Sequence, residues 1–124
     1  MNKRTTYGVL AWVAWGLLLV CWTAALLTPV PPKVGEVVPV SLRFLAAKGL
    51  HLCAYAFLAF VLCWLPASRR GRVMVWTGLL AHAALTEVGQ LYVEGRTGSV
   101  GDVAINATGL TLGVLAGLAF RMTR

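Results

Sequence analysis

Charged side chains are scarce in this sequence. They make up 12% of its 124 residues, only four are acidic, and 59% of the residues are hydrophobic. Soluble domains are about one-quarter charged and about half apolar, so this composition excludes an ordinary water-soluble domain. The length is that of one domain, and we treat residues 1–124 as a single unit. The sequence therefore indicates a membrane protein whose partners include membrane lipids.

Two further absences narrow the function classes. The net charge is +7, but Lys and Arg form short clusters between apolar runs, without the continuous basic face of a nucleic-acid-binding protein. Cys21, Cys53 and Cys63 lie inside apolar runs, without a CxxC spacing or neighbouring ligands. We therefore expect no nucleic-acid partner, no metal site and no other cofactor.

Four apolar stretches are long enough to cross a bilayer. A hydrocarbon core of about 30 Å takes about 20 helical residues, whose backbone groups must be hydrogen-bonded within the helix. The stretches are residues 7–28, 48–65, 73–92 and 100–120. Proline residues follow the first two stretches and stop their helices. We predict an all-α membrane protein, a bundle of four transmembrane helices, with a short interfacial helix over residues 40–47.

The distribution of Lys and Arg predicts the orientation of these helices, because cytoplasmic flanks are enriched in both residues. Four of them, and all four acidic residues, flank the membrane on one side. The seven on the other side are Lys3, Arg4, Arg69, Arg70, Arg72, Arg121 and Arg124. We therefore expect a multi-pass protein of the cell membrane with both termini in the cytoplasm.

Polar residues gather at the opposite, extracytoplasmic ends of the last three helices. On the second helix they are spaced i, i+3, i+7, which places them on one helical face. Because successive helices alternate in direction, all of these residues lie at the same membrane level. Ionisable residues inside a membrane are costly and commonly mark functional sites. The eight residues are Lys48, His51, Tyr55, Glu87, Gln90, Arg96, Asp102 and Asn106.

A purely structural interpretation is that these residues join the helices to one another. The pairs would be Lys48 with Glu87, Arg96 with Asp102, and Gln90 with Asn106. Interhelical hydrogen bonds in membranes contribute only about 0.6 kcal/mol each, which would not require so many ionisable residues at one level. We therefore favour a functional site.

The last helix also carries small residues at a regular spacing. Gly109, Gly113 and Gly117 form a small-xxx-small pattern, which permits close approach of another helix. The partner is either a helix of the same chain or a second copy in a homo-oligomer. We interpret His82, near the middle of the third helix, as a hydrogen-bonded packing residue outside the site.

Four short motifs follow one another between Lys48 and Gly113. They are Lys48-x-x-His51-x-x-x-Tyr55, Thr86-Glu87-x-x-Gln90, Gly95-Arg96-Thr97-Gly98-Ser99-x-x-Asp102 and Asp102-x-x-x-Asn106-x-x-Gly109-x-x-x-Gly113. Their order and spacing resemble the VanZ-like family, named for an accessory protein of glycopeptide resistance that confers low-level teicoplanin tolerance. The resemblance implies a cell-envelope membrane protein without an established reaction. The family usually has an acidic residue before the lysine, whereas this chain has Ala47.

In the hypothesis that we favour, the outward-facing site binds or modifies an anionic lipid or an envelope precursor. Basic residues would hold phosphate oxygens, while the imidazole and a carboxylate would move a proton. The candidate proton-transfer residues are His51, Glu87 and Asp102. The candidate binding residues are Lys48, Tyr55, Gln90, Arg96 and Asn106.

Two alternatives belong to other function classes. The first is a non-enzymatic protein that binds a lipid, a glycopeptide or a partner protein through the same residues. The second is a proton-coupled transporter, which we rank last because four helices are few for a transport pathway. No nucleophile motif accompanies the polar residues, so the sequence leaves open whether the protein is an enzyme.

Overall fold

Each apolar stretch of the sequence forms one long helix. The computed structural model describes residues 3–30 and 39–123, with side chains from Thr5 onward. The helices are α1 (Lys3–Leu27), α3 (Val40–Leu62), α4 (Arg69–Gln90) and α5 (Val100–Met122). The prediction of an all-helical fold with four long helices is confirmed over these residues.

Three helices begin earlier than the sequence predicts, and the first of them is α1, which begins at Lys3 instead of residue 7. The separate interfacial helix expected over residues 40–47 is instead the first two turns of α3, because no proline or glycine interrupts the chain there. α4 begins at Arg69, because the Ser68 hydroxyl accepts the Gly71 N–H at 3.1 Å and caps the helix. The arginines expected in a loop therefore lie in the first turn of α4.

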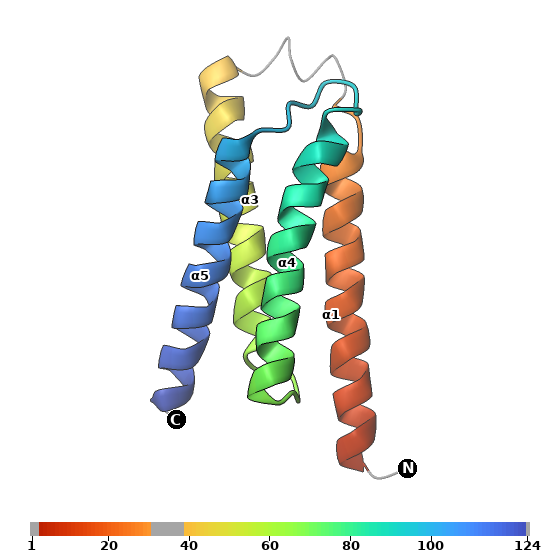
Figure 1. Ribbon diagram of the computed structural model, residues 1–124, viewed down its shortest axis with the longest axis vertical. Helices are drawn as coiled ribbons and strands as arrows, with labels where there is room; N and C mark the ends of the chain where they lie inside the picture. The colour runs from red at the N-terminus through yellow and green to blue at the C-terminus, as the bar shows by residue number, and fades with distance from the viewer. Residues whose placement is uncertain (1–2, 31–38, 124) are drawn as a thin grey trace.

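The helices alternate in direction along the bundle (Figure 1). The start of α1, the end of α5 and the turn over residues 63–68 lie at one end, which we call the terminal end. The connection over residues 91–99 lies at the other end, which we call the connection end. In the view of Figure 1, α1 and α5 lie at the two sides, with α3 and α4 between them.

The contact between α3 and α5 is the closest in the bundle, since their backbones touch without intervening side chains. A Cβ atom on Gly109 would overlap the carbonyl oxygen of Leu52, and one on Gly113 would overlap that of Ala56. Further along α5, a Cβ atom on Gly117 would lie 2.8 Å from Cys63 Sγ. The glycine face of α5 thus packs on α3 of the same chain, and a homo-oligomer through this face would have to displace α3.

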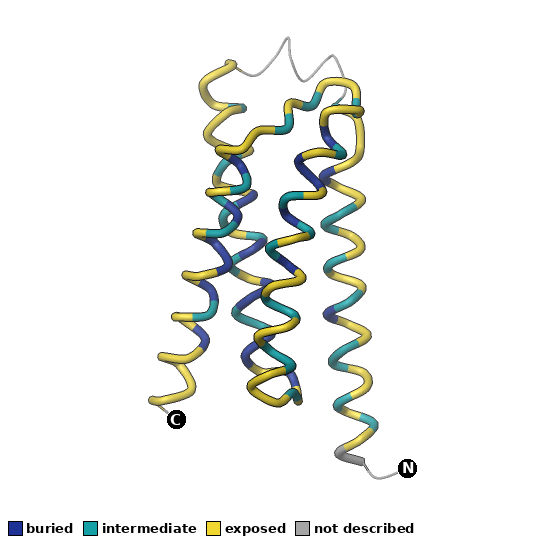
Figure 2. The backbone as a smooth tube through the Cα atoms, viewed as in Figure 1, coloured by how far each residue is buried: buried dark blue, intermediate teal, exposed yellow. Residues whose placement is uncertain are grey.

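Every helix carries exposed residues (Figure 2), and many of them have large apolar side chains. Leu17 is 59% exposed on α1 and Leu115 is 58% exposed on α5. Three helical segments are long and apolar enough to cross a membrane: Thr5–Leu27, Val40–Leu62 and Val100–Met122. α4 is less apolar because its first turn carries Arg69, Arg70 and Arg72 and its buried face carries Thr86, Glu87 and Gln90.

We expect Gly113→Ala to destabilise the protein by about 1–3 kcal/mol, because overpacking against rigid backbone atoms of α3 forces the helices apart. Gly78→Ala is the matched control, since no atom lies within 4 Å of a Cβ placed on Gly78. Thermal unfolding of the two variants in the same detergent measures the difference. Equal unfolding temperatures would show that the α3–α5 contact does not require glycine.

Candidate functional site

An ion pair joins α3 to α5 at the connection end. Lys48 Nζ, two turns into α3, contacts Asp102 Oδ1 in the first turn of α5. The Lys48 side chain is 23% exposed and that of Asp102 is 8% exposed. Solvent therefore screens the pair only in part, and each charge depends on the other for compensation.

Ser99 fixes the second oxygen of Asp102. It is the N-cap of α5, and its hydroxyl accepts the Asp102 N–H at 3.1 Å and donates to Asp102 Oδ2 at 2.8 Å. The carboxylate also lies where the positive end of the helix dipole stabilises a negative charge. Lys48 thus contacts one oxygen of Asp102 and Ser99 the other. Because Ser99 fixes the carboxylate, Asp102 can hold Lys48 in place.

Glu87 lies deeper, near the end of α4, and is 4% exposed. Its Oε2 accepts the Ser99 N–H at 3.1 Å, and its Oε1 accepts an N–H of Asn106 Nδ2 at 3.4 Å. Gly98 makes the first bond attainable, since a Cβ atom there would overlap the carbonyl oxygen of Glu87. The connection therefore packs directly on the last turns of α4.

His51 completes this network from α3. Its Nδ1 lies 3.1 Å from Asn106 Oδ1 and 3.5 Å from Glu87 Oε1. Because the carboxylate accepts the Asn106 amide N–H, the amide oxygen faces the imidazole, and Nδ1 must donate. In neutral His51 the proton is then on Nδ1, and Nε2, which has no partner among the described residues, is free to accept one.

Tyr55 belongs to a second hydrogen-bonded chain, farther from the connection end. Its hydroxyl lies 3.1 Å from His82 Nδ1 and 3.4 Å from Thr86 Oγ1. His82 Nε2 lies 2.8 Å from Thr23 Oγ1 on α1. His82 is thus a hydrogen-bonded residue that links three helices. Trp22 connects the two chains, with its ring edge-to-face against both His51 and Tyr55.

Gln90 and Arg96 bind the end of α1. Gln90 Nε2 donates to the Leu26 carbonyl at 3.2 Å, and Arg96 donates to the carbonyls of Ala25 and Thr28 at 2.7 and 3.1 Å. The last carbonyls of a helix have no partner within it, which explains this capping.

The interhelical pairs proposed from the sequence are therefore replaced by others. Lys48 contacts Asp102 and not Glu87, whereas Arg96 and Gln90 bond to α1. Asn106, the expected partner of Gln90, bonds to His51 and Glu87.

A cleft of about 900 Å³ opens beside these residues at the connection end. The first turns of α3, residues 95–97 and Val30 form its walls. Its polar lining residues are Arg43, Lys48, His51, Gln90, Arg96, Thr97 and Asp102. Glu87, Asn106 and Tyr55 do not line the cleft. Glu87 and Asn106 hold His51 in place, whereas Tyr55 bonds to His82 and Thr86.

Arg43 and Ser99 are two members of this region that the sequence did not single out. Arg43 lines the cleft, and its Nε is buried without a hydrogen-bond partner in the described part of the chain. Arg43 falls in the helix predicted over residues 40–47, but spacing along this helix does not show that it lines one cleft with Lys48. The Ser99-x-x-Asp102 spacing is itself a helix-start signal. Over the described residues, no group of three or more His, Cys, Asp or Glu could hold a metal ion.

Comparison with known proteins agrees with the resemblance seen in the motifs. The family model for VanZ/LLP1 matches residues 15–121, which include every residue of the network and the cleft. No curated protein and no solved structure matches the chain. The match covers most of the chain, and three helices can cross a membrane. The protein is a membrane protein that belongs to the VanZ/LLP1 family.

Proposed function

We propose that the cleft binds the phosphate of an anionic lipid or a lipid-linked envelope precursor. The observation that carries this proposal is the set of three cations, Arg43, Lys48 and Arg96, around one cleft. Asp102 neutralises Lys48. Among the described residues, Arg96 hydrogen-bonds to carbonyl groups alone and the Nε of Arg43 has no partner. Arginine pairs strongly with phosphate because its planar guanidinium can donate two parallel hydrogen bonds.

The apolar part of the cleft favours a lipid over a free ion. Val40, Leu42 and Phe44 line it together with the cations, and all three are exposed. The Phe44 ring also lies 4.9 Å from Lys48 Nζ, a cation–π distance. A ligand with an anionic head and an apolar tail satisfies both kinds of surface.

We also propose that all four helices cross the cell membrane with both termini in the cytoplasm. The described arginines of the terminal end are Arg69, Arg70, Arg72 and Arg121, and the described acids of the chain lie toward the connection end. This asymmetry is typical of a cytoplasmic terminal end. Lys33, Glu36 and Arg124 lie outside the described residues, and so do the side chains of Lys3 and Arg4.

With this orientation, the cleft opens toward the outer leaflet, where envelope precursors are exposed. We therefore propose that the protein changes the exposure of such a precursor, which would link it to low-level teicoplanin tolerance.

A second candidate function is modification of the bound ligand. The hydrogen-bonded chain from His51 through Asn106 to Glu87 supports it, because this chain orients Nε2 as a proton acceptor beside the cleft. Each oxygen of Asp102 already has a partner, Lys48 for Oδ1 and Ser99 for Oδ2, so we assign Asp102 to holding Lys48. Proton transfer would thus use His51, with Glu87 stabilising the imidazolium.

We expect Arg43→Gln to weaken binding of a polyprenyl phosphate about tenfold, since a charge-assisted hydrogen bond contributes about 1.5–3 kcal/mol. The variant leaves the Lys48–Asp102 pair intact. Native mass spectrometry of the protein with this lipid gives the dissociation constant. Arg70→Gln, at the terminal end, is the matched control, and equal affinities of the two variants would contradict the proposal.

We expect Asp102→Asn to lower the free energy of unfolding by about 1–3 kcal/mol, because it leaves the half-buried Lys48 without its counter-ion. The double variant Lys48→Met, Asp102→Asn should recover most of this stability, since it removes both charges. Thermal unfolding in detergent measures both effects. No recovery in the double variant would show that Asp102 acts mainly through Ser99.

Glu87→Gln separates binding from modification. We expect affinity for polyprenyl phosphate within about threefold of wild type, because the new side chain keeps a hydrogen-bonding oxygen and Glu87 does not line the cleft. Under the binding proposal, cells that carry the variant keep their teicoplanin tolerance. Lost tolerance with retained affinity would establish proton transfer as the function instead.

A further inference from the structure

A second cavity lies at the terminal end of the bundle, separate from the cleft. It has a volume of about 420 Å³, within the range of about 300–1,000 Å³ typical of ligand sites. The end of α3, the start of α4 and the last turns of α5 line it. Its apolar lining residues are Leu62, Val73, Trp76, Val114 and Leu118, with Cys63 beside them. We call this cavity the terminal groove.

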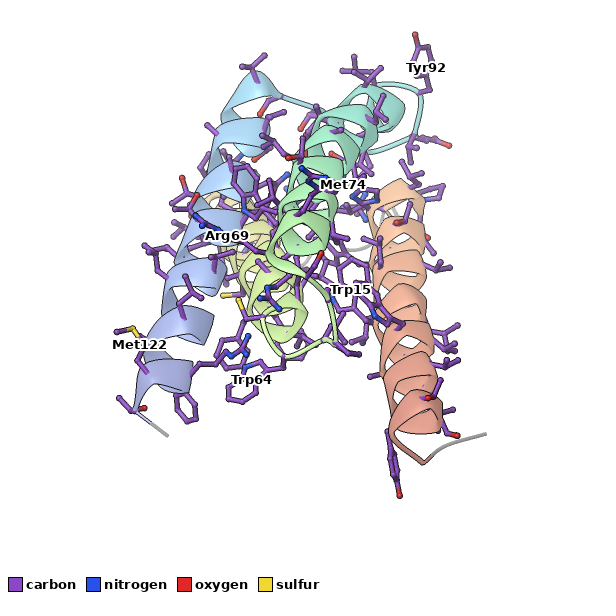
Figure 3. The ribbon with its side chains drawn as sticks, turned by 60° about the horizontal axis from the view of Figure 1, so that its bottom comes forward. Trp15, Trp64, Arg69, Met74, Tyr92 and Met122 are labelled. Atoms are coloured by element: carbon purple, nitrogen blue, oxygen red, sulfur yellow. The ribbon has the colours of Figure 1, made fainter. Side chains whose placement is uncertain are left out.

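Two arginines add positive charge to this apolar groove. Arg69 and Arg72 both line it, and Figure 3 views the protein with this end brought forward and labels Arg69. The guanidinium of Arg72 donates one N–H to the Ala67 carbonyl at 2.8 Å. The side chain of Arg69 has no hydrogen bond or ion pair within residues 39–123. The described acids, Glu87, Glu94 and Asp102, belong to the other half of the bundle.

Within α4 itself, the position of these arginines is unfavourable. They occupy the first turn of α4, which contains no acidic residue. The N-terminus of a helix carries a partial positive charge, so basic residues there are repelled by the helix dipole. A phosphate group at this place would compensate both the arginines and the dipole.

We propose that the terminal groove binds an anionic phospholipid from the leaflet at the terminal end. The phosphate contacts Arg69 and Arg72, and one acyl chain lies along Val73, Trp76 and Leu118. Charge complementarity identifies this occupant, because a zwitterionic lipid would bring its own cation toward the arginines. This site is independent of the cleft and of the function proposed for it.

Four substitutions, each added singly to an Arg43→Gln background, test the groove. Arg69→Gln removes a charge that the fold does not use, and Leu118→Trp fills the groove from an exposed position on α5. Their matched controls are Arg70→Gln on the same turn and Leu115→Trp on the same helix, neither of which lines the groove. All four are made in the Arg43→Gln background, which weakens lipid binding in the cleft.

The measurement is native mass spectrometry with phosphatidylglycerol and phosphatidylcholine. We expect the background protein to prefer phosphatidylglycerol, Arg69→Gln and Leu118→Trp to bind it about tenfold more weakly, and the controls to be unchanged. Equal binding by all four variants would overturn the proposal. So would equal affinity of the background protein for the two lipids. Thermal unfolding of each variant verifies that it is folded.

Discussion

The close contact between α3 and α5 is the constraint on which the site depends. Gly109 and Gly113 allow the two backbones to touch at Leu52 and Ala56. One or two turns nearer the connection end, the same contact brings Asn106 beside His51, and Asp102 beside Lys48. Larger residues in place of the glycines would separate these pairs. The geometry of the site therefore depends on the packing of α3 against α5.

The low hydropathy of α4 has two sources, the three arginines of its first turn and the polar residues of its buried face. Its buried face carries Thr86, Glu87 and Gln90, which would be costly in a bilayer without partners. Each has one: Glu87 bonds to Ser99 and Asn106, and Gln90 bonds to the Leu26 carbonyl. The Thr86 hydroxyl donates a hydrogen bond to the His82 carbonyl of α4. The polar groups therefore face inward, and the outer face of α4 stays apolar.

The sequence predicted what depends on spacing along one helix. Helical periodicity placed Lys48 and His51 on one face, and alternating direction placed the polar ends of three helices at one level. The pairing between helices depends on their rotation about their axes, which spacing does not define. Lys48 therefore contacts Asp102 instead of Glu87, because α3 packs on α5.

The roles of Arg96 and Gln90 were hidden for another reason. Both bind backbone carbonyls at the end of α1, and these acceptors exist at every helix end whatever the side chains are. The sequence predicts a separate interfacial helix over residues 40–47, and Arg43 would then lie outside the bundle. In the structure this segment continues into α3, which brings Arg43 to the cleft.

The two ends of the bundle differ in how their positive charges are compensated. At the connection end, protein groups compensate most of them: Asp102 pairs with Lys48, and carbonyls accept from Arg96. The positive charge without a protein partner is therefore mainly that of Arg43. A single charge of this kind suits the recognition of one phosphate. At the terminal end no described acid pairs with Arg69, which is exposed. In the proposal made for the terminal groove, an anionic leaflet compensates this charge, and the arginines that favour the proposed orientation would also hold a lipid between the helices.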